Sequence, residues 1–173
     1  MTGAAKRELV CHPQSSSKLV RGVQVTLQRL SGGRLASRYV IEGAIDRLRI
    51  PPPAPPVRAG GLWQHTCFEI FVSERMPAYR EFNFSPSGQW AAYAFAAYRQ
   101  VAEAPAAEPS VSVRVGTDRL ELDASIPALE TSRLSVALSA VIEDASGELS
   151  YWALKHPPGK PDFHHPDGFA LEL

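Results

Sequence analysis

The sequence predicts an all-β fold, a single antiparallel β-sandwich domain spanning residues 1–173. Apolar and polar residues alternate with a period of two in many short runs, and Gly, Pro or Ser separates these runs. No long stretch has a helical period. Together these observations are typical of a sandwich or a barrel.

The N-terminal segment, residues 1–17, has no clear alternation and is expected to be an irregular arm. The first alternating run covers residues 19–27, where Val23, Val25 and Leu27 share one face. Because side chains on a strand point alternately to its two faces, this run predicts a half-buried strand.

A Ser-Gly-Gly turn at residues 31–33 leads into a second run at residues 35–41, in the manner of a hairpin. Its inward set is predicted to be Leu35, Tyr39 and Ile41. Further strands are predicted at residues 66–72, 79–85, 90–98, 111–115, 120–126, 134–143, 149–154 and 169–173.

Two segments leave alternatives open. The proline run at residues 50–56 prefers an extended conformation and predicts a loop ending near Gly60 and Gly61, with a linker between two domains as the rival interpretation. The Ala-rich stretch from Ala91 to Ala106 also suits a helix, because alanine favours helix.

Composition excludes several partners. The 18 basic residues balance the 18 acidic residues, so we expect no nucleic acid and no membrane surface as partner. Cys11 and Cys67 fit no metal or redox spacing, and two free thiols are the simpler expectation beside one long-range disulfide. The N-terminus has no continuous apolar run, so the expected location is cytoplasmic.

The hairpin at residues 79–98 carries most of the functional argument. Phe82 and Phe84 point to one face of its first strand, and a polar stripe points to the other. The stripe consists of Tyr79, Glu81, Asn83 and Ser85.

A four-residue turn at Pro86 to Gln89 predicts how the two strands pair. It places Ser85 opposite Trp90, Asn83 opposite Ala92, Glu81 opposite Ala94 and Tyr79 opposite Ala96. Phe82, Phe84, Tyr93 and Phe95 then form an aromatic core, and the polar stripe has a floor of alanines with Trp90 as a wall. A slip of one residue reverses this arrangement.

The stripe suggests a recess for a sugar-sized ligand, and Glu69 from the neighbouring strand is expected on the same surface. An ordinary solvated sheet face is the alternative for each residue. Glu69 and Glu81 also suit the carboxylate pair of a glycosidase, which requires a raised pKa on one of them.

Three of the five histidines lie in a proline-rich C-terminal loop. Asp162, His164 and His165 are weak candidates for a metal site, and hydrogen bonding of these groups to the backbone is the alternative. Trp152, Lys155 and His156 are expected to edge a pocket by stacking and polar contacts.

Two blocks carry a family resemblance: residues 62–71, Leu-Trp-Gln-His-Thr-Cys-Phe-Glu-Ile-Phe, and residues 79–93, which include Glu-Phe-Asn-Phe-Ser-Pro-Ser-Gly-Gln-Trp. They resemble a bacterial family of DOMON-like domains, and residues 151–156 and 161–164 are similar to its closing signature. The wider superfamily is similar to family-nine carbohydrate-binding modules and to haem- or sugar-binding DOMON domains. The resemblance implies an antiparallel sandwich with a ligand on one sheet.

The resemblance also implies roles for particular residues. Paired tryptophans sandwich the sugar in the carbohydrate modules, and Trp63, Trp90 and Trp152 are the candidates. Haem binding needs an axial His or Met, for which His65 is a better candidate than Met76.

The sequence thus predicts a non-catalytic, cytoplasmic domain that binds a small polar molecule, such as a sugar, without a cofactor. The rivals are an enzyme using the glutamates or the histidine loop, and an interaction module that pairs through a strand edge. The candidate ligand-binding residues are Trp63, His65, Glu69, Tyr79, Glu81, Asn83, Ser85, Trp90, Trp152, Lys155 and His156.

Overall fold

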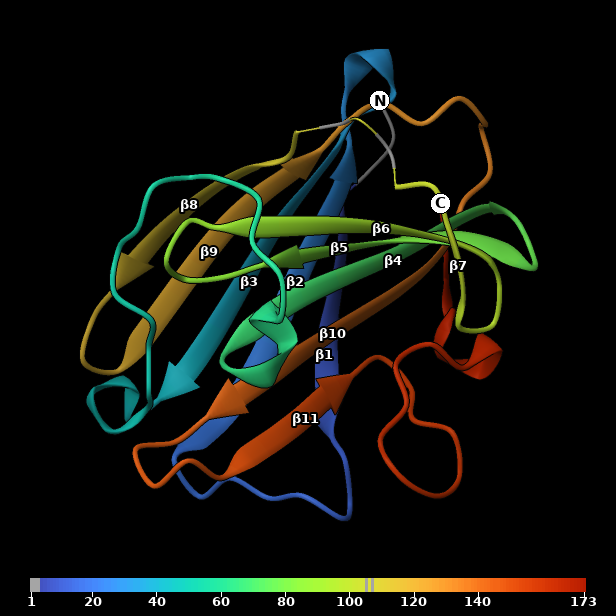
Figure 1. Ribbon diagram of the computed structural model, residues 1–173. Coiled ribbons are helices and arrows are strands. Elements are labelled where there is room, and N and C mark those ends of the chain that lie inside the picture. The colour runs from blue at the N-terminus through green and yellow to red at the C-terminus, as the bar shows by residue number, and fades with distance from the viewer. Residues whose placement is uncertain (1–3, 105, 107) are drawn as a thin grey trace.

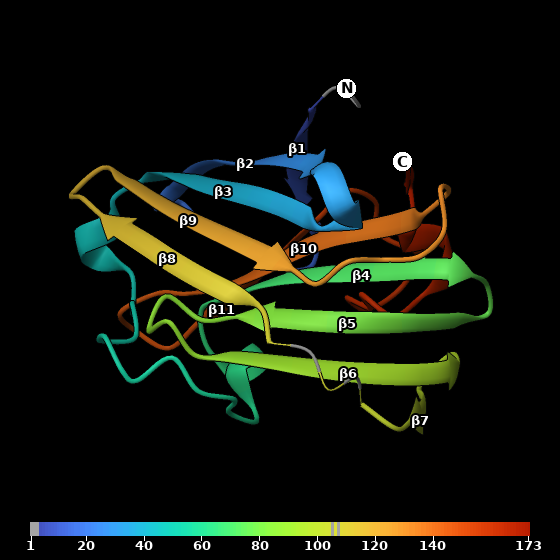
Figure 2. The ribbon, with the colours of Figure 1, turned by 90° about the horizontal axis from the view of Figure 1, so that it is seen from above.

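The computed structural model describes residues 4–104, 106 and 108–173, and its strands are arranged in two layers that face each other (Figure 1, Figure 2). Sheet A contains β1 (Ala5–Cys11), β2 (Val20–Arg29), β3 (Leu35–Gly43), β9 (Arg119–Ile126) and β8 (Ser110–Val115), in this order. Sheet B contains β7 (Gln100–Ala102), β6 (Trp90–Ala97), β5 (Ala78–Phe84), β4 (Cys67–Arg75), β10 (Ser135–Glu143) and β11 (Leu149–Ala153). The predicted antiparallel sandwich is confirmed.

The two sheets are continuous at one side. The end of β1 pairs with β11 through Val10 and Cys11, while the rest of β1 pairs with β2. The short β12 (Leu171–Glu172) pairs with the beginning of β10. All pairings between these strands are antiparallel.

The expected irregular arm at residues 1–17 is wrong for residues 5–11, which form β1. Its burial pattern has only one buried residue, Leu9, so β1 lacks the alternation that identifies a half-buried strand. Residues 1–3 of that arm lie outside the described part of the chain, as does residue 105 of the Ala-rich stretch. The helix alternative for this stretch is wrong, because Trp90–Ala97 and Gln100–Ala102 are strands.

The core lies between the sheets. The predicted inward sets on β2 and β3 are confirmed: Val23, Val25, Leu27, Leu35, Tyr39 and Ile41 are all buried. Phe68, Phe82 and Phe84 pack against them from sheet B. Tyr39 also joins the layers, since its hydroxyl donates a 2.7 Å hydrogen bond to the Glu69 carbonyl on β4.

Cys11 and Cys67 are both free thiols, in agreement with the simpler expectation. Within the described residues, no helix has the length and the apolar character needed to cross a membrane. The predicted loop at residues 50–56 contains no helix or strand.

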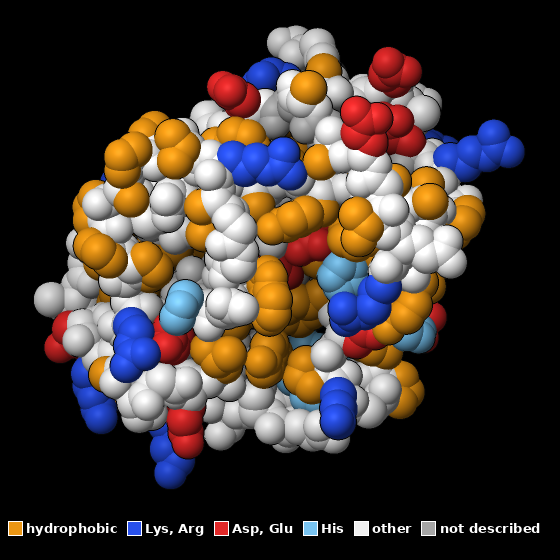
Figure 3. All heavy atoms as spheres, in the orientation of Figure 1, with side chains coloured by type: hydrophobic (Ala, Val, Ile, Leu, Met, Phe, Trp, Pro, Cys, Tyr) orange, Lys and Arg blue, Asp and Glu red, His pale blue; other side chains and the backbone are white. Residues whose placement is uncertain are grey.

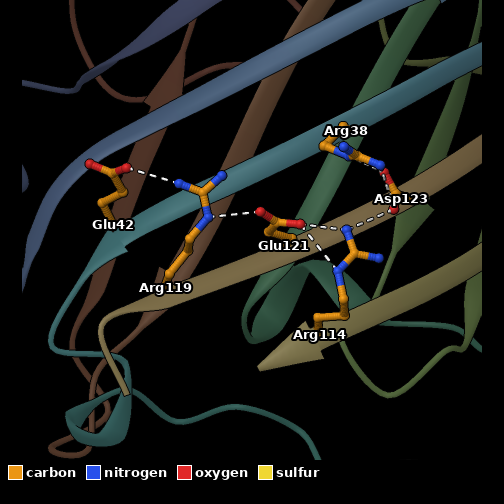
Figure 4. Close-up of polar contacts among 6 residues, drawn as sticks. All are labelled: Arg38, Glu42, Arg114, Arg119, Glu121 and Asp123. Atoms are coloured by element: carbon orange, nitrogen blue, oxygen red, sulfur yellow. Dashed lines mark hydrogen bonds and ion pairs between the residues drawn. The ribbon is translucent and has the colours of Figure 1, made fainter. Parts of the chain in front are cut away.

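The solvent face of sheet A carries a network of paired charges (Figure 4). Arg114 and Arg119 both contact Glu121, and Arg119 also reaches Glu42 at 3.1 Å. Hydrogen bonds from these two arginines lower the pKa of Glu121 to about 2. The charges compensate one another, so this face is suited to stability and solubility more than to ligand binding.

We expect Glu121→Gln to lower the melting temperature slightly at low salt, and to have a smaller effect at about 1 M salt, where charges are screened within about 3 Å. The reason is that the variant leaves Arg114 and Arg119 with weaker partners. Thermal unfolding at the two salt concentrations measures this. A decrease that is equal at both would contradict an electrostatic role.

Candidate functional site

The outward face of sheet B is hollowed into a cavity of about 520 Å³. Figure 3 views this face and shows acidic side chains deep in a hollow that is rimmed by apolar groups, with histidine beside them. The aromatic lining residues are Trp63, Tyr93, Phe95, Tyr151 and Phe163. The charged or titratable lining residues besides the tyrosines are Glu69, Glu81, Arg99 and His164. We call this space the outer cavity.

Two glutamates from neighbouring strands share the floor of the outer cavity. Glu69 on β4 pairs with Asn83 and Phe71 pairs with Glu81, so the glutamates are diagonal neighbours on one face of the sheet. They are only 2% and 5% exposed, respectively. Ser139 donates a 3.1 Å hydrogen bond to Glu69 Oε2 from β10.

Burial raises the pKa of both carboxyl groups, because it disfavours the charged form. The pKa of Glu81 rises to about 7, against weaker opposing effects of the Asn83 amide and the Arg99 charge. The pKa of Glu69 rises well above its usual range through burial first and the Glu81 charge second. With a pKa of about 7, Glu81 keeps its proton in a substantial fraction of the molecules at neutral pH.

A neutral histidine adjoins the carboxylates. His164 Nε2 lies 3.6 Å from Glu81 Oε2, which is longer than a hydrogen bond, and burial lowers the pKa of His164 to about 4. On the other side of the ring, Nδ1 lies 2.9 Å from the Tyr79 hydroxyl oxygen, which also accepts a hydrogen bond from the Arg99 backbone N–H. If Tyr79 donates to Nδ1, the remaining ring proton is on Nε2 and faces Glu81.

Asp162 holds the C-terminal loop over the sheet. Its carboxylate accepts hydrogen bonds from the Tyr98 hydroxyl at 2.6 Å and from Arg99 Nη2 at 2.9 Å. It also accepts the His164 backbone N–H at 3.1 Å. These contacts connect the β6–β7 turn to the loop and thereby place His164 in the cavity.

A second apolar cluster, separate from the main core, supports this loop from below. Phe71, Tyr79 and Phe95 are buried in it, with Phe163 and Phe169 packed against them. The rings of Tyr79 and Phe95 are stacked, with centroids 4.8 Å apart. We call these five residues the outer cluster.

The predicted pairing of the hairpin strands is wrong by one residue. Glu81 lies opposite Tyr93, Asn83 opposite Ala91 and Tyr79 opposite Phe95. The turn contains three residues, because the Ser85 N–H donates to the Gln89 carbonyl oxygen and Gly88 adopts a positive φ of 92°. The expected alanine floor is therefore absent, and Tyr93 and Phe95 face the outer cavity instead of the main core.

Of the predicted ligand-binding residues, the structure brings Trp63, Glu69 and Glu81 to the cavity surface, with Tyr79 and Asn83 directly behind them. Trp90 and Trp152 lie in the main core, so neither forms the expected wall. Ser85 lies in the hairpin turn, where its hydroxyl accepts from Ser87.

Three further predicted residues lie away from the cavity lining. His65 contacts Glu143 Oε2 at 2.8 Å through Nδ1, and His156 Nε2 contacts the Val10 carbonyl oxygen at 2.7 Å. Lys155 is exposed. Neither of the two predicted axial haem ligands lines the cavity, since Met76 also lies outside it, between β4 and β5.

The metal candidates have other partners. Asp162 binds Tyr98 and Arg99, His164 adjoins Tyr79, and His165 Nδ1 accepts the Asp167 N–H. Within the described residues, no group of three or more His, Cys, Asp and Glu side chains is placed to hold a metal ion.

Sequence reasoning missed Arg99, Tyr151 and Phe163 in the cavity lining. It also placed Tyr93 and Phe95 on the wrong face of the sheet. The Pro-Ser-Gly sequence at residues 86–88 was the available signal, since a glycine in third position favours a three-residue hairpin turn.

No protein-family model matches this chain, and no curated protein matches it in sequence. Solved structures do match it in fold. A provisionally assigned carbohydrate-binding protein from Bacteroides uniformis has a TM-score of 0.70 at 16% identity, over 96% of this chain and 84% of that chain.

Family-nine carbohydrate-binding modules from Caldicellulosiruptor kristjanssonii are also similar. One, in complex with cellotriose, has a TM-score of 0.61 at 11% identity, over 90% of this chain and 75% of that chain. Another, in complex with glucose, has a TM-score of 0.58 at 11% identity, over 84% of this chain and 71% of that chain. At these identities the likeness shows the fold alone.

Proposed function

We propose that this domain binds a carbohydrate in the outer cavity. The observation that carries the proposal is the composition of the cavity, in which aromatic rings form the walls and buried hydrogen-bonding groups form the floor. Sugar rings present apolar C–H faces and a rim of hydroxyl groups, and this lining complements both. A volume of about 520 Å³ lies within the usual range for small-molecule sites.

Relatives in fold support the same assignment. Two of the similar structures are named as complexes with cellotriose and with glucose. We also propose that the domain binds the sugar without changing it chemically, because those similar proteins are named carbohydrate-binding modules. It is tested together with the second candidate function below.

Trp63 is the proposed stacking platform. It lies in the short 3-10 turn η3 (Leu62–Gln64), lines the outer cavity, and is 52% exposed, so its ring face is accessible to a ligand. An exposed tryptophan contributes little to the folded state through burial, which suggests that its aromatic surface is available for binding.

We expect Trp63→Ala to weaken binding of cellotriose or glucose about tenfold, as loss of an aromatic contact of about 1.4 kcal/mol would do, without a large loss of stability. Isothermal titration measures the affinity, and thermal unfolding with and without sugar measures the stabilisation by ligand. Val115→Ala is the matched control, because Val115 is 54% exposed on sheet A. Unchanged affinity in the Trp63 variant would contradict the stacking role.

Hydrolysis of a glycosidic bond is the second candidate function. The observation that favours it is that Glu69 and Glu81 face one cavity and both have a raised pKa, as a general acid requires. Incubation with cello-oligosaccharides and aryl glycosides distinguishes the two functions. Turnover that is lost in Glu81→Gln would support hydrolysis, and binding without turnover would support a binding module.

A further inference from the structure

The outer cavity contains two carboxyl groups but no positive charge dedicated to them. Among the described residues, His164 is the only basic side chain within ion-pair distance of either Glu69 or Glu81, and its low pKa keeps it neutral at neutral pH. Arg99 also lines the cavity, but its guanidinium pairs with Asp162 at 2.9 Å. Buried carboxylates are usually paired, so the missing cation is unusual.

A buried amide beside the two glutamates also lacks a well-formed hydrogen bond to the described residues. Asn83 is 0% exposed, and neither its side-chain oxygen nor its nitrogen makes a hydrogen bond of ordinary length and angle within the described structure, although the amide lies close enough to Glu81 to lower the pKa of that carboxyl. It lies directly opposite Glu69 in the β4–β5 pairing, on the face that bears the outer cavity. An unsatisfied buried amide is costly, and such groups call for a functional explanation.

The aromatic walls favour a cation as well. Trp63, Tyr93 and Phe95 come from different elements and line the same space. The faces of such rings attract a positive charge, most strongly where water is excluded. Carboxylates on the floor and rings on the walls together match a ligand that has both a sugar ring and an ammonium group.

We propose that the outer cavity selects a sugar with a protonated amine, with the ammonium group placed beside Glu69 and Glu81, in front of the buried Asn83 amide. This inference rests on the proposed carbohydrate-binding function. It goes beyond that function by assigning the charge of the ligand.

Proton release is an expected consequence. Without a ligand, Glu81 keeps its proton in a substantial fraction of the molecules at neutral pH, and an ammonium group would replace that proton as the balancing positive charge. Other titratable or charged groups also face this site from the surrounding elements: Arg58, Cys67, Tyr79, Tyr93, Arg99, Tyr151, Asp162 and His164. Glu81 is the group expected to titrate near neutral pH, because Cys67, Tyr79 and Tyr93 have raised pKa values and those of Asp162 and His164 are lowered.

Calorimetric titration of the whole chain at about pH 7 tests the proposal with matched ligands. The amines are glucosamine and 6-amino-6-deoxyglucose, the neutral partners are N-acetylglucosamine and glucose, and cyclohexylamine is the amine without a sugar. We expect the amino sugars to bind at least about tenfold more tightly than their neutral partners, and to release protons as shown by the dependence of the heat on the buffer.

Substitution then locates the charge. Glu81→Gln is expected to remove the preference for amino sugars over their neutral partners, whereas Glu121→Gln, which removes one carboxylate from sheet A, is expected to preserve both the preference and the binding of glucose. Thermal unfolding of both variants verifies that each is folded.

The possible results distinguish failure of this inference from failure of the proposed carbohydrate-binding function. Equal or tighter binding of the neutral sugars would overturn this inference and leave the carbohydrate function intact. Tight binding of cyclohexylamine without any sugar would support the cation site and overturn the carbohydrate function. No binding by any of these ligands would overturn both, and a preference that persists in Glu81→Gln would overturn the assignment to this carboxylate pair.

Discussion

Replacement of Glu81 by Gln is expected to stabilise the protein by about 2.5 kcal/mol more at about pH 8 than at about pH 5. Burial raises the pKa of Glu81 from 4.5 to about 7, so the folded chain keeps a proton that the unfolded chain releases. The associated stability is fully present below pH 4.5 and is lost as the pH rises through about 7. Glutamine does not ionise, so the variant does not undergo this decrease in stability as the pH rises.

His164 has the opposite effect on the pH profile. Its pKa is lowered from 6.5 to about 4 by burial, so the folded state loses stability as the pH falls through this interval. The two contributions offset each other between about pH 4 and pH 7 in the wild-type protein. The difference between wild type and variant reports the titration of Glu81 together with its effect on Glu69, and urea unfolding at a series of pH values measures it.

Glu121→Gln provides the control for this experiment. The pKa of Glu121, on the solvent face of sheet A, is lowered to about 2, so its ionisation is complete throughout the measured range. Its effect on stability should not grow between about pH 5 and pH 8. If the effect of Glu81→Gln also stayed constant over this range, the buried, proton-holding state of Glu81 would be refuted.

Removal of the Phe71 ring is expected to destabilise the protein by about 3–5 kcal/mol and also to release the C-terminal loop. Phe71 is 0% exposed in the outer cluster, and its ring contacts His164 and Phe169 with centroid distances of 5.1 Å and 6.4 Å. Phe71→Ala leaves a void under the loop. We therefore expect faster amide hydrogen exchange at residues 163–169 and weaker sugar binding.

Phe84→Ala is the matched comparison. Phe84 is also 0% exposed, but it lies in the main core between the sheets. A similar loss in the free energy of unfolding is expected, with little local change in exchange at the C-terminal loop beyond the global effect. Identical exchange profiles for the two variants would contradict the separate role of the outer cluster.

Local alternation was sufficient to predict most of the fold. The inward sets of β2 and β3 and the outward direction of Glu69 follow from a period of two, which each strand expresses by itself. The strand β1 was missed because its sequence, Ala-Lys-Arg-Glu-Leu-Val-Cys, buries only Leu9 fully. Its pairing with both β2 and β11 is a long-range feature that no local pattern reports.

The candidate site was predicted in part for the same reason. Phe82 and Phe84 do point to one face of β5, and Tyr79, Glu81 and Asn83 to the other, as their own spacing requires. The two faces of the partner strand, β6, were predicted the wrong way round. The length of the turn decides which side chains of β6 lie opposite those of β5. One residue fewer in that turn replaced alanines by Tyr93 and Phe95.

The sequence by itself therefore determined the all-β architecture, the positions of most strands and the location of Glu69 and Glu81 on one face of sheet B. Only the tertiary structure decided that this face is covered. The outer cluster and the Asp162–Arg99 pair hold the C-terminal loop against β4, β5 and β6, although these segments are distant in sequence. That packing excludes water from the two carboxyl groups, and a polar stripe that the sequence shows as an open strand face becomes the floor of a cavity.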